Sequence, residues 1–210
     1  MNKKGVLAVI SGFSGAGKGT VISGLMDRYD NYALSISATT RAPRLDEENG
    51  KDYFFVTEEE FQNMILEDQL IEFAKYVNNY YGTPKAYVDE QLCLGKDVIL
   101  EIEIQGALKI KEKFPDTLLL FIAPPSAKEL NKRLVSRGTE SKEVIISRLQ
   151  RANEEACGID EYHYILVNDD LDTCIDTMHS IIQNERWNVK RNQDFINNLK
   201  TQLLEYSKGE

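Results

Sequence analysis

The residues most able to do chemistry stand together near the amino end of the chain. Positions 12–20 match the spacing GxxxxGK, between an apolar run and a helical pattern. Glycines let backbone N–H groups turn inward around phosphate oxygens, and Lys18 brings a positive charge to the β- and γ-phosphates. The run consists of Gly12, Phe13, Ser14, Gly15, Ala16, Gly17, Lys18, Gly19 and Thr20. The sequence therefore predicts a site for a nucleoside triphosphate.

One position departs from that pattern. The Ser or Thr that usually follows the lysine and touches Mg²⁺ is Gly19 here, although Thr20 can still reach a phosphate. We therefore expect Mg²⁺ to be carried mainly by ATP, with water and carboxylates from elsewhere, and we assign it no direct protein ligand. The motif predicts binding but not the reaction, because GTPases, ATPases and kinases share it.

A second anion site is suggested by two arginines in a polar, irregular stretch. Arg41 and Arg44 lie three residues apart, Pro43 stiffens the loop, and Tyr53 adds a hydroxyl group. Two guanidinium groups can bind one phosphate through paired hydrogen bonds. On residue types alone, a solvated loop without a ligand explains this stretch equally well.

Further arginines gather in the polar helical segment that follows Pro125. They are Arg133, Arg137, Arg148 and Arg151. Arg133 and Arg137 share one helix face if the first helix continues that far. By composition alone this segment is an ordinary charged hairpin in solvent, and we interpret Arg151 as a surface residue.

Composition excludes several classes of function. The chain has 210 residues, of which 42% are hydrophobic, and a formal net charge of -9, which disfavours general binding of nucleic acid. The apolar run at 6–10 is too short for a secretory signal, and no run approaches a membrane span. The three cysteines form no CxxC pair and fit free thiols in a reducing compartment. We expect a cytoplasmic protein with small phosphorylated ligands, and no nucleic acid, membrane or obligate protein partner is indicated.

The hydrophobic pattern predicts the elements that position these groups. Strands are expected at 6–10, 33–37, 53–56, 70–77, 97–102, 117–123 and 162–167. Helices are expected at 20–29, from 57, from about 84 to before 95, and at 105–113, 126–136, 142–155 and 171–186, with a polar helix after them. Strands alternating with helices favour an α/β fold with a parallel sheet covered on both faces. The stretch 37–88 has close-spaced strands and aromatics, typical of a mostly antiparallel insert.

Eight short motifs follow one another through most of the chain. They are the glycine-rich run at 12–20, SATTRAPR at 37–44, NGKDYFF at 49–55, IEFA at 71–74, NYYGT at 79–83, EIEIQGA at 101–107, RGTES at 137–141 and VNDDL at 167–171. In this order they resemble the guanylate kinase family. The resemblance implies an enzyme that transfers the γ-phosphoryl group of ATP to GMP or dGMP, giving ADP and GDP, in purine metabolism and GMP recycling. ATP and Mg²⁺ are the implied cofactors.

The resemblance also implies a division of the chain and a set of residue roles. A single domain over 1–210 would comprise a P-loop parallel sheet core (1–36, 92–125 and 156–210), an inserted GMP-binding lobe (37–91) and a helical lid (126–155). The GMP phosphate would be held by Arg41, Arg44, Tyr53 and Tyr81, and the guanine by Ser37, Glu72, Thr83 and Glu103. Catalysis would rest on Lys18, Arg41, Arg137 and Arg148, and Arg133 and Asn168 would join positions 12–20 in binding ATP. The family often has Ser in place of Thr83 and Asp in place of Glu103.

The chemistry of guanine supports the role of Glu72 independently. Guanine offers N1–H and an amino group on one edge, and a carboxylate accepts from both, whereas adenine places an acceptor at N1. A wrong base would leave buried groups unsatisfied, so such a site can discriminate strongly. Phosphoryl transfer to GMP needs no general base, because the second pKa of a phosphate is about 6. Positioning and positive charge are what the enzyme must supply.

Two other functions fit parts of the sequence. A guanylate-kinase-like module of a scaffold protein uses the same fold to bind phosphopeptides without catalysis, but such modules generally lose the glycine-rich run that is intact here. A kinase for another monophosphate, such as AMP or dTMP, shares the ending GKGT at 17–20. A coupled assay with ATP and GMP distinguishes a phosphopeptide-binding module from an enzyme. Turnover measured across a panel of nucleoside monophosphates distinguishes a guanylate kinase from a kinase for another monophosphate.

Overall fold

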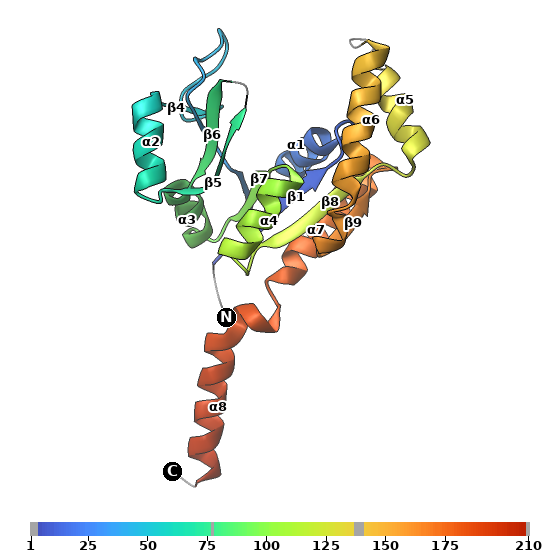
Figure 1. Cartoon of the computed structure of the whole chain (residues 1–210). Coiled ribbons are helices and arrows are strands. Elements are labelled where there is room, and N and C mark those ends of the chain that lie inside the picture. The colour runs from blue at the N-terminus through green and yellow to red at the C-terminus, as the bar shows by residue number, and fades with distance from the viewer. Residues whose placement is uncertain (1–3, 77, 137–140, 209–210) are drawn as a thin grey trace.

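The core of the protein is a five-stranded parallel sheet. In the computed structural model, which describes residues 4–76, 78–136 and 141–208, the strands run in the order β2 (Tyr32–Leu34), β7 (Asp97–Glu101), β1 (Leu7–Gly12), β8 (Leu118–Ala123) and β9 (Tyr164–Val167) (Figure 1). Every pairing between neighbours in this sheet is parallel. The predicted parallel core is confirmed. Because all five strands point the same way, their carboxyl ends meet along one edge, where α/β proteins place ligands.

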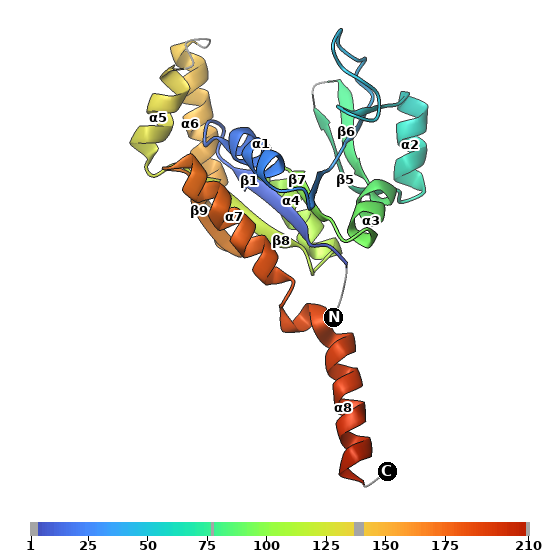
Figure 2. The same cartoon turned by 180° about the vertical axis from the view of Figure 1, so that it is seen from behind.

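Helices cover both faces of the core sheet (Figure 2). Side chains alternate along β1, so Ala8 and Ile10 pack on one face with α1 (Lys18–Arg28) and α7 (Leu171–Glu185). Leu7 and Val9 pack on the other face, with helices α3 (Lys85–Cys93) and α4 (Ile104–Lys113). The nearly continuous apolar sequence of β1 and β8 reflects this burial on both sides.

A second sheet forms the lobe on one side of the core. Its order is β4 (Phe54–Phe55), β3 (Ala38–Thr39), β6 (Asn79–Pro84) and β5 (Leu70–Tyr76). The pairs β3–β6 and β5–β6 are antiparallel, whereas β3–β4 is parallel. Helix α2 (Glu58–Leu66) packs against this sheet through the fully buried ring of Phe61, and Thr57 caps the helix in a reciprocal bond pair with Glu60.

A helical hairpin rises on the other side of the core (Figure 1). It consists of α5 (Ala127–Ser136) and α6 (Lys142–Ala156), and the short helix η1 (Ile159–Glu161) leads from it to β9. Leu130 and Leu134 of α5 pack with Ala152 of α6, which holds the two helices together. The predicted catalytic residue Arg137 lies outside the described residues.

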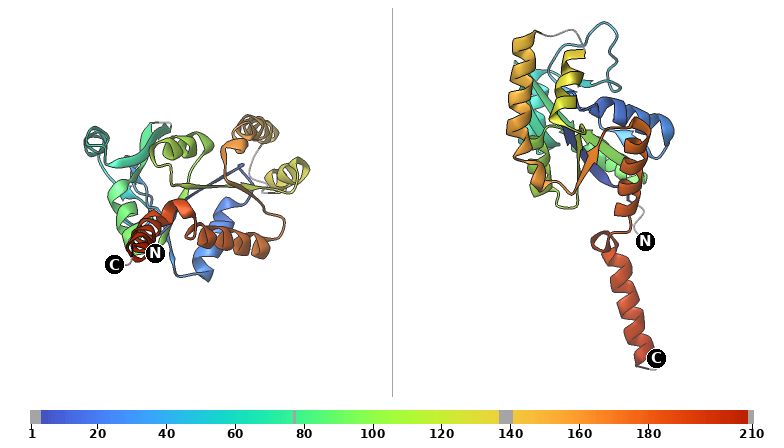
Figure 3. Two further views of the ribbon diagram at one scale, coloured as in Figure 1. Left: turned by 90° about the horizontal axis from the view of Figure 1, so that it is seen from below. Right: turned by 90° about the vertical axis from the view of Figure 1, so that its right-hand side faces the viewer.

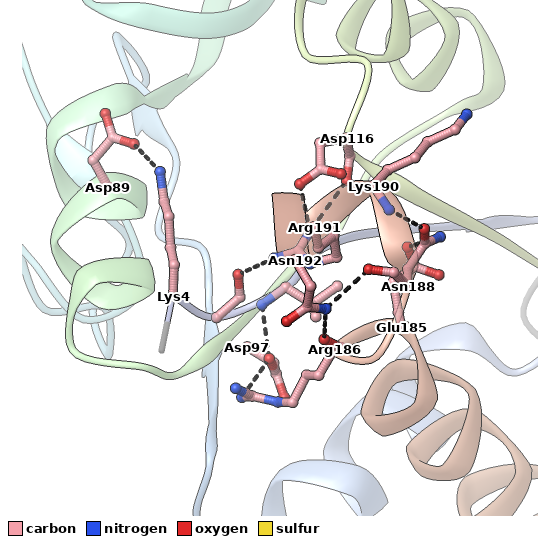
Figure 4. Close-up of polar contacts among 12 residues, drawn as sticks. Lys4, Asp89, Asp97, Asp116, Glu185, Arg186, Asn188, Lys190, Arg191 and Asn192 are labelled. Carbon is pink, nitrogen blue, oxygen red and sulfur yellow. Dashed lines mark hydrogen bonds and ion pairs between the residues drawn. The ribbon is translucent and has the colours of Figure 1, made fainter. Parts of the chain in front are cut away.

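The described part of the chain ends in a helix that projects away from the core. Helix α8 (Gln193–Ser207) follows the short helix η2 (Val189–Asn192) and points to the side opposite the lobe and hairpin (Figures 1 and 3). Its base is held by Arg191, whose 5% exposed side chain donates to Asp116 Oδ2 (2.7 Å) and to the Gly5 carbonyl (2.7 Å) (Figure 4). Among the described residues, no helix combines the length and apolar character needed to cross a bilayer.

A buried carboxylate ties helix α7 to the sheet. Asp97, at the start of β7, is fully buried and accepts hydrogen bonds from the Val6 backbone N–H (2.8 Å) and from Arg186 Nη2 (2.6 Å) on its Oδ1. Its Oδ2 accepts from Gln183 (2.9 Å) and Asn31 (3.1 Å). A charge this deeply buried is tolerated because donors surround it, and it fixes the position of α7.

Candidate active site

The glycine-rich run forms a tight loop between β1 and α1. Gly15 and Gly17 adopt φ values of 93° and 92°, which side chains of L-residues rarely allow. A Cβ atom at Gly15 would come within 2.9 Å of Leu134 Cδ2, and one at Gly17 within 2.5 Å of Asn168 Nδ2. At Gly19, in contrast, a Cβ atom would meet nothing within 4 Å, so packing does not exclude a hydroxyl-bearing residue there.

Lys18 and Arg148 bring positive charge to this loop. Lys18, the first residue of α1, donates from Nζ to the carbonyl of Gly12 (2.8 Å) and lies near that of Phe13 (3.4 Å). Arg148 of α6 donates from Nη1 to Ser14 Oγ (2.8 Å). The start of α1 adds the positive end of a helix dipole, so backbone N–H groups, a lysine and an arginine gather where a triphosphate would bind.

Arg133 and Asn168 support the loop from the side of α5 and β9. The buried Asn168 donates from Nδ2 to the Ala16 carbonyl (2.8 Å). Arg133 donates from Nη2 to the Asn168 carbonyl (2.9 Å) and from Nη1 to the same Ala16 carbonyl (3.4 Å), while Glu129 accepts from its Nε (3.1 Å). Both side chains therefore hold the loop in place, and their contact with ATP stays a prediction.

In the lobe, an arginine and two tyrosines come together. The guanidinium group of Arg41 lies 5.3 Å from the ring centroid of Tyr53, and the rings of Tyr53 and Tyr81 are 6.1 Å apart. Glu47 accepts from Arg41 Nη2 at 2.7 and 2.9 Å and from the backbone N–H of Arg44 at 2.8 Å. These bonds raise the pKa of Arg41 and lower that of Glu47. The side chain of Arg44 is exposed, and its backbone N–H provides the hydrogen bond to this group.

Glu72 and Thr83 form a largely buried polar pair on neighbouring strands. Thr83, 1% exposed, donates from Oγ1 to Glu72 Oε1 at 3.0 Å. Burial raises the pKa of Glu72, and the bond from Thr83 and the charge of Lys109 offset part of that rise. A carboxylate with one oxygen held by a threonine is suited to accept hydrogen bonds from a base edge.

Glu103, also predicted to bind the guanine, lines the same cleft as Ser37 and pairs there with the helical hairpin. It precedes α4 at the N-cap, its side chain is 73% exposed, and its Oε2 forms an ion pair with Arg151 Nη2 of α6 at 2.6 Å. The structure therefore joins Glu103 to the helical hairpin, and Arg151 does not merely face solvent. The predicted contact of Glu103 with the base stays a prediction.

The phosphate loop and the lobe line one cleft of about 690 Å³, which lies at the carboxyl ends of β1, β2 and β7. The loop contributes Gly12, Ser14 and Lys18, and the lobe and its connection contribute Ser35, Ser37, Asp52 and Tyr53. The remaining polar walls are Glu101, Glu103, Arg148, Arg151 and Glu155. The parallel sheet explains the gathering, because residues that follow different strands emerge at one edge.

Sequence reasoning missed several polar residues of these surroundings. Arg151 lies one turn after Arg148, so helical spacing could have placed both on one face. Glu101 ends β7 at the same edge as the loop, a position that strand order alone reveals. Glu47 lies six residues after Arg41 in an irregular loop, and no periodic signal in the sequence connects the two.

Comparisons with known proteins agree with these observations. The family model described as guanylate kinase matches residues 4–185. A guanylate kinase of Caldanaerobacter subterraneus is 52% identical over 194 residues (92% of this chain and 94% of that protein), and one of Clostridium perfringens is 45% identical over 209 residues (100% and 94%). The crystal structure of a guanylate kinase from Anaplasma phagocytophilum superposes with a TM-score of 0.68 at 33% identity, covering 90% of this chain and 89% of that one.

Proposed function

The chain belongs to the guanylate kinase family and is an ATP:GMP phosphotransferase, and we propose that its cleft is where the γ-phosphoryl group passes from ATP to GMP. One observation carries this proposal. The phosphate loop with Lys18 and Arg148 and the lobe residues Ser37 and Tyr53 line a single cleft, so two nucleotides bound from opposite sides would meet end to end.

On the donor side, we propose that the loop 12–20 binds the triphosphate through its backbone N–H groups. Its fit to phosphate is supported by the cradle at Gly15 and Gly17, which a Cβ atom would fill. Lys18 neutralises charge near the transferred group, and Arg148 reaches it from α6. Arg137 is proposed to act with Arg148, and Arg133 and Asn168 to border the adenosine while they support the loop.

On the acceptor side, the GMP phosphate is proposed to bind to Arg41, Arg44, Tyr53 and Tyr81. The proximity of Arg41 to both tyrosines supports this assignment for three of them, and the exposed Arg44 is expected to turn inward when phosphate binds. The guanine is proposed to bind to Glu72 and Thr83, with Ser37 and Glu103 at its margin.

The chemistry follows from this arrangement. An oxygen of the GMP phosphate forms a bond to the γ-phosphorus, the bond between that phosphorus and the bridging β–γ oxygen breaks, and ADP leaves with the electron pair of the broken bond. The attacking oxygen already carries negative charge near neutral pH. The positively charged residues of the cleft therefore serve to align this oxygen and to screen the repulsion between the GMP phosphate and the triphosphate. Closure of the hairpin and the lobe over the cleft excludes water, which would otherwise accept the phosphoryl group.

Mg²⁺ bound to the triphosphate would withdraw charge from the phosphate oxygens. Within the described part of the chain, no three His, Cys, Asp or Glu residues gather in a way that could hold a metal ion. We propose that Mg²⁺ enters on ATP, with Glu101 and Glu103 among the carboxylates that line the cleft. We also propose a cytoplasmic location, in line with free thiols at Cys93, Cys157 and Cys174.

The decisive experiment measures ADP release with ATP and each of GMP, dGMP, AMP, CMP, UMP and dTMP in turn. We expect a kcat/KM for GMP at least ~100-fold above that for AMP, because a site built for guanine donors leaves buried groups unpaired with adenine. Equal rates with GMP and AMP would refute the guanine pocket, and no turnover with GMP would refute the assigned reaction.

A further inference from the structure

Helix α6 reaches the walls of the cleft through two arginines that lie one turn apart. Arg148 bonds Ser14 Oγ in the phosphate loop at 2.8 Å, and Arg151 pairs with Glu103 at 2.6 Å. Residues three positions apart share one face of a helix, so this face spans from the loop after β1 to the turn after β7. The helix is thereby fastened to the core at two points.

The side of α6 next to this face has an apolar attachment. Ile145, Leu149 and Ala152 pack with Leu130 and Leu134 of α5, and α5 is the partner of α6 in the hairpin. This packing joins α6 to α5, and Phe13 of the phosphate loop adds an apolar contact between the hairpin and the core. The direction of α6 toward the turn after β7 depends on further, polar contacts. The two arginines supply such contacts on the side that faces the cleft.

The ion pair between Arg151 and Glu103 orients side chains across the cleft and contributes little to the stability of the fold. The side chains are 52% and 73% exposed, and an ion pair this open adds little to the stability of the fold. Glu155, one turn further along α6, accepts from Arg151 Nε at 3.1 Å and keeps the guanidinium group directed across the cleft. The negative charge of Glu103 is the main reason why the pKa of Arg151 is raised.

We propose that Arg151 is a positioning residue for phosphoryl transfer, which holds α6 against Glu103 and thereby keeps Arg148 at the phosphate loop. The inference rests on the proposed function, because it assigns Arg148 to the transferring group. A small displacement of a group that contacts the transition state reduces turnover even where the fold is intact.

The test is a double-mutant cycle measured by steady-state turnover with saturating ATP and GMP. Arg151→Gln should lower kcat by ~3–5-fold, the range that corresponds to loss of about 1 kcal/mol, with the KM for ATP changed less than ~2-fold. In an Arg148→Ala background the same replacement should have no further effect, because Arg151 acts through Arg148. Arg151→Lys should recover at least half of the lost kcat.

Two controls separate positioning from a general effect on the fold. Glu154→Gln removes an exposed carboxylate from the same helix that does not line the cleft, so its kcat should stay within ~2-fold of wild type. The urea midpoint of Arg151→Gln should equal that of wild type, as expected for an exposed pair. A kcat that drops equally with and without Arg148, or that does not change at all, would overturn the proposal. Failure of the wild-type enzyme to phosphorylate GMP would instead refute the assigned reaction itself.

Discussion

Replacing Glu72 by glutamine should remove most of the enzyme's preference for guanine. The native carboxylate presents two acceptors, of which Oε1 is held by Thr83 at 3.0 Å. Glutamine is nearly isosteric and keeps one acceptor for the threonine hydroxyl, so the local fold should survive. Its amide nitrogen, however, turns a donor toward the N1–H of guanine, where the native enzyme has an acceptor.

The size of the effect follows from the chemistry of this contact. Hydrogen bonds to a charged group contribute about 1.5–3 kcal/mol, which corresponds to a decrease of ~10–150-fold in kcat/KM for GMP. Adenine has an acceptor at N1, which can accept from the new amide nitrogen, so kcat/KM for AMP should stay the same or rise. The ratio of the two values should narrow by at least ~10-fold.

A coupled ADP assay with each nucleotide at several concentrations measures both constants. Glu59→Gln, which removes an exposed carboxylate from α2 in the same lobe, is the matched control and should leave the ratio unchanged. If Glu72→Gln lowered both kcat/KM values in proportion, the carboxylate would not contact the base edge and the assignment of the pocket would be wrong.

The pH dependence of kcat/KM for GMP also tests the role of Glu72. Burial raises the pKa of Glu72, and only the ionised form accepts from both guanine donors, so kcat/KM for GMP should fall as the pH drops through that raised pKa. Thr83→Val removes a bond that lowers this pKa, and should therefore move the acid limb to higher pH. If the acid limb of the pH profile were at the same pH in Thr83→Val as in wild type, another group, such as the GMP phosphate, would determine the pH at which kcat/KM falls.

Three further predictions concern other parts of the molecule. Lys18→Ala should lower kcat at least ~100-fold in the coupled assay while the urea midpoint stays near that of wild type. Asp97→Ala should lower the free energy of unfolding by about 3–5 kcal/mol in urea titration, because Arg186 and the Val6 N–H lose a buried partner; a loss below about 1 kcal/mol would contradict this. His163 Nδ1 accepts from the Leu119 N–H, and desolvation lowers the pKa of His163; the unfolded chain therefore binds more protons, and stability should fall as pH drops below about 6.5. His163→Gln should flatten the Tm against pH between about 7.5 and 5.5, and an unchanged slope would refute the role of this histidine.

The parts of the site that the sequence could predict are those made by neighbours in the chain. The strand, glycine-rich loop and helix around Lys18 are continuous, so their pattern specifies the geometry directly. The parallel core followed from apolar strands that alternate with helices. The resemblance to a family also indicated Arg41, Tyr53 and Tyr81, which the structure brings together.

Contacts between distant segments were beyond the reach of the sequence. Whether Glu103 turns to a base or to Arg151 depends on where α6 lies relative to β7, and periodicity within either element does not specify that angle. The resemblance predicted that Asn168 contacts ATP, but it did not predict the hydrogen bond from the Asn168 side chain to the Ala16 carbonyl, 152 positions earlier in the chain. Such bonds depend on tertiary packing, which local propensity does not encode.

Helix α8 affects how the enzyme can be handled and observed. Because it leads away from the core on the side opposite the lobe and hairpin, a fluorophore or surface linker attached near Ser207 would leave the entrance for both nucleotides open (Figure 1). A helix that projects from the core also increases the frictional coefficient of the protein. The 23.9 kDa chain should therefore diffuse more slowly, and elute earlier from a gel-filtration column, than a sphere of equal mass.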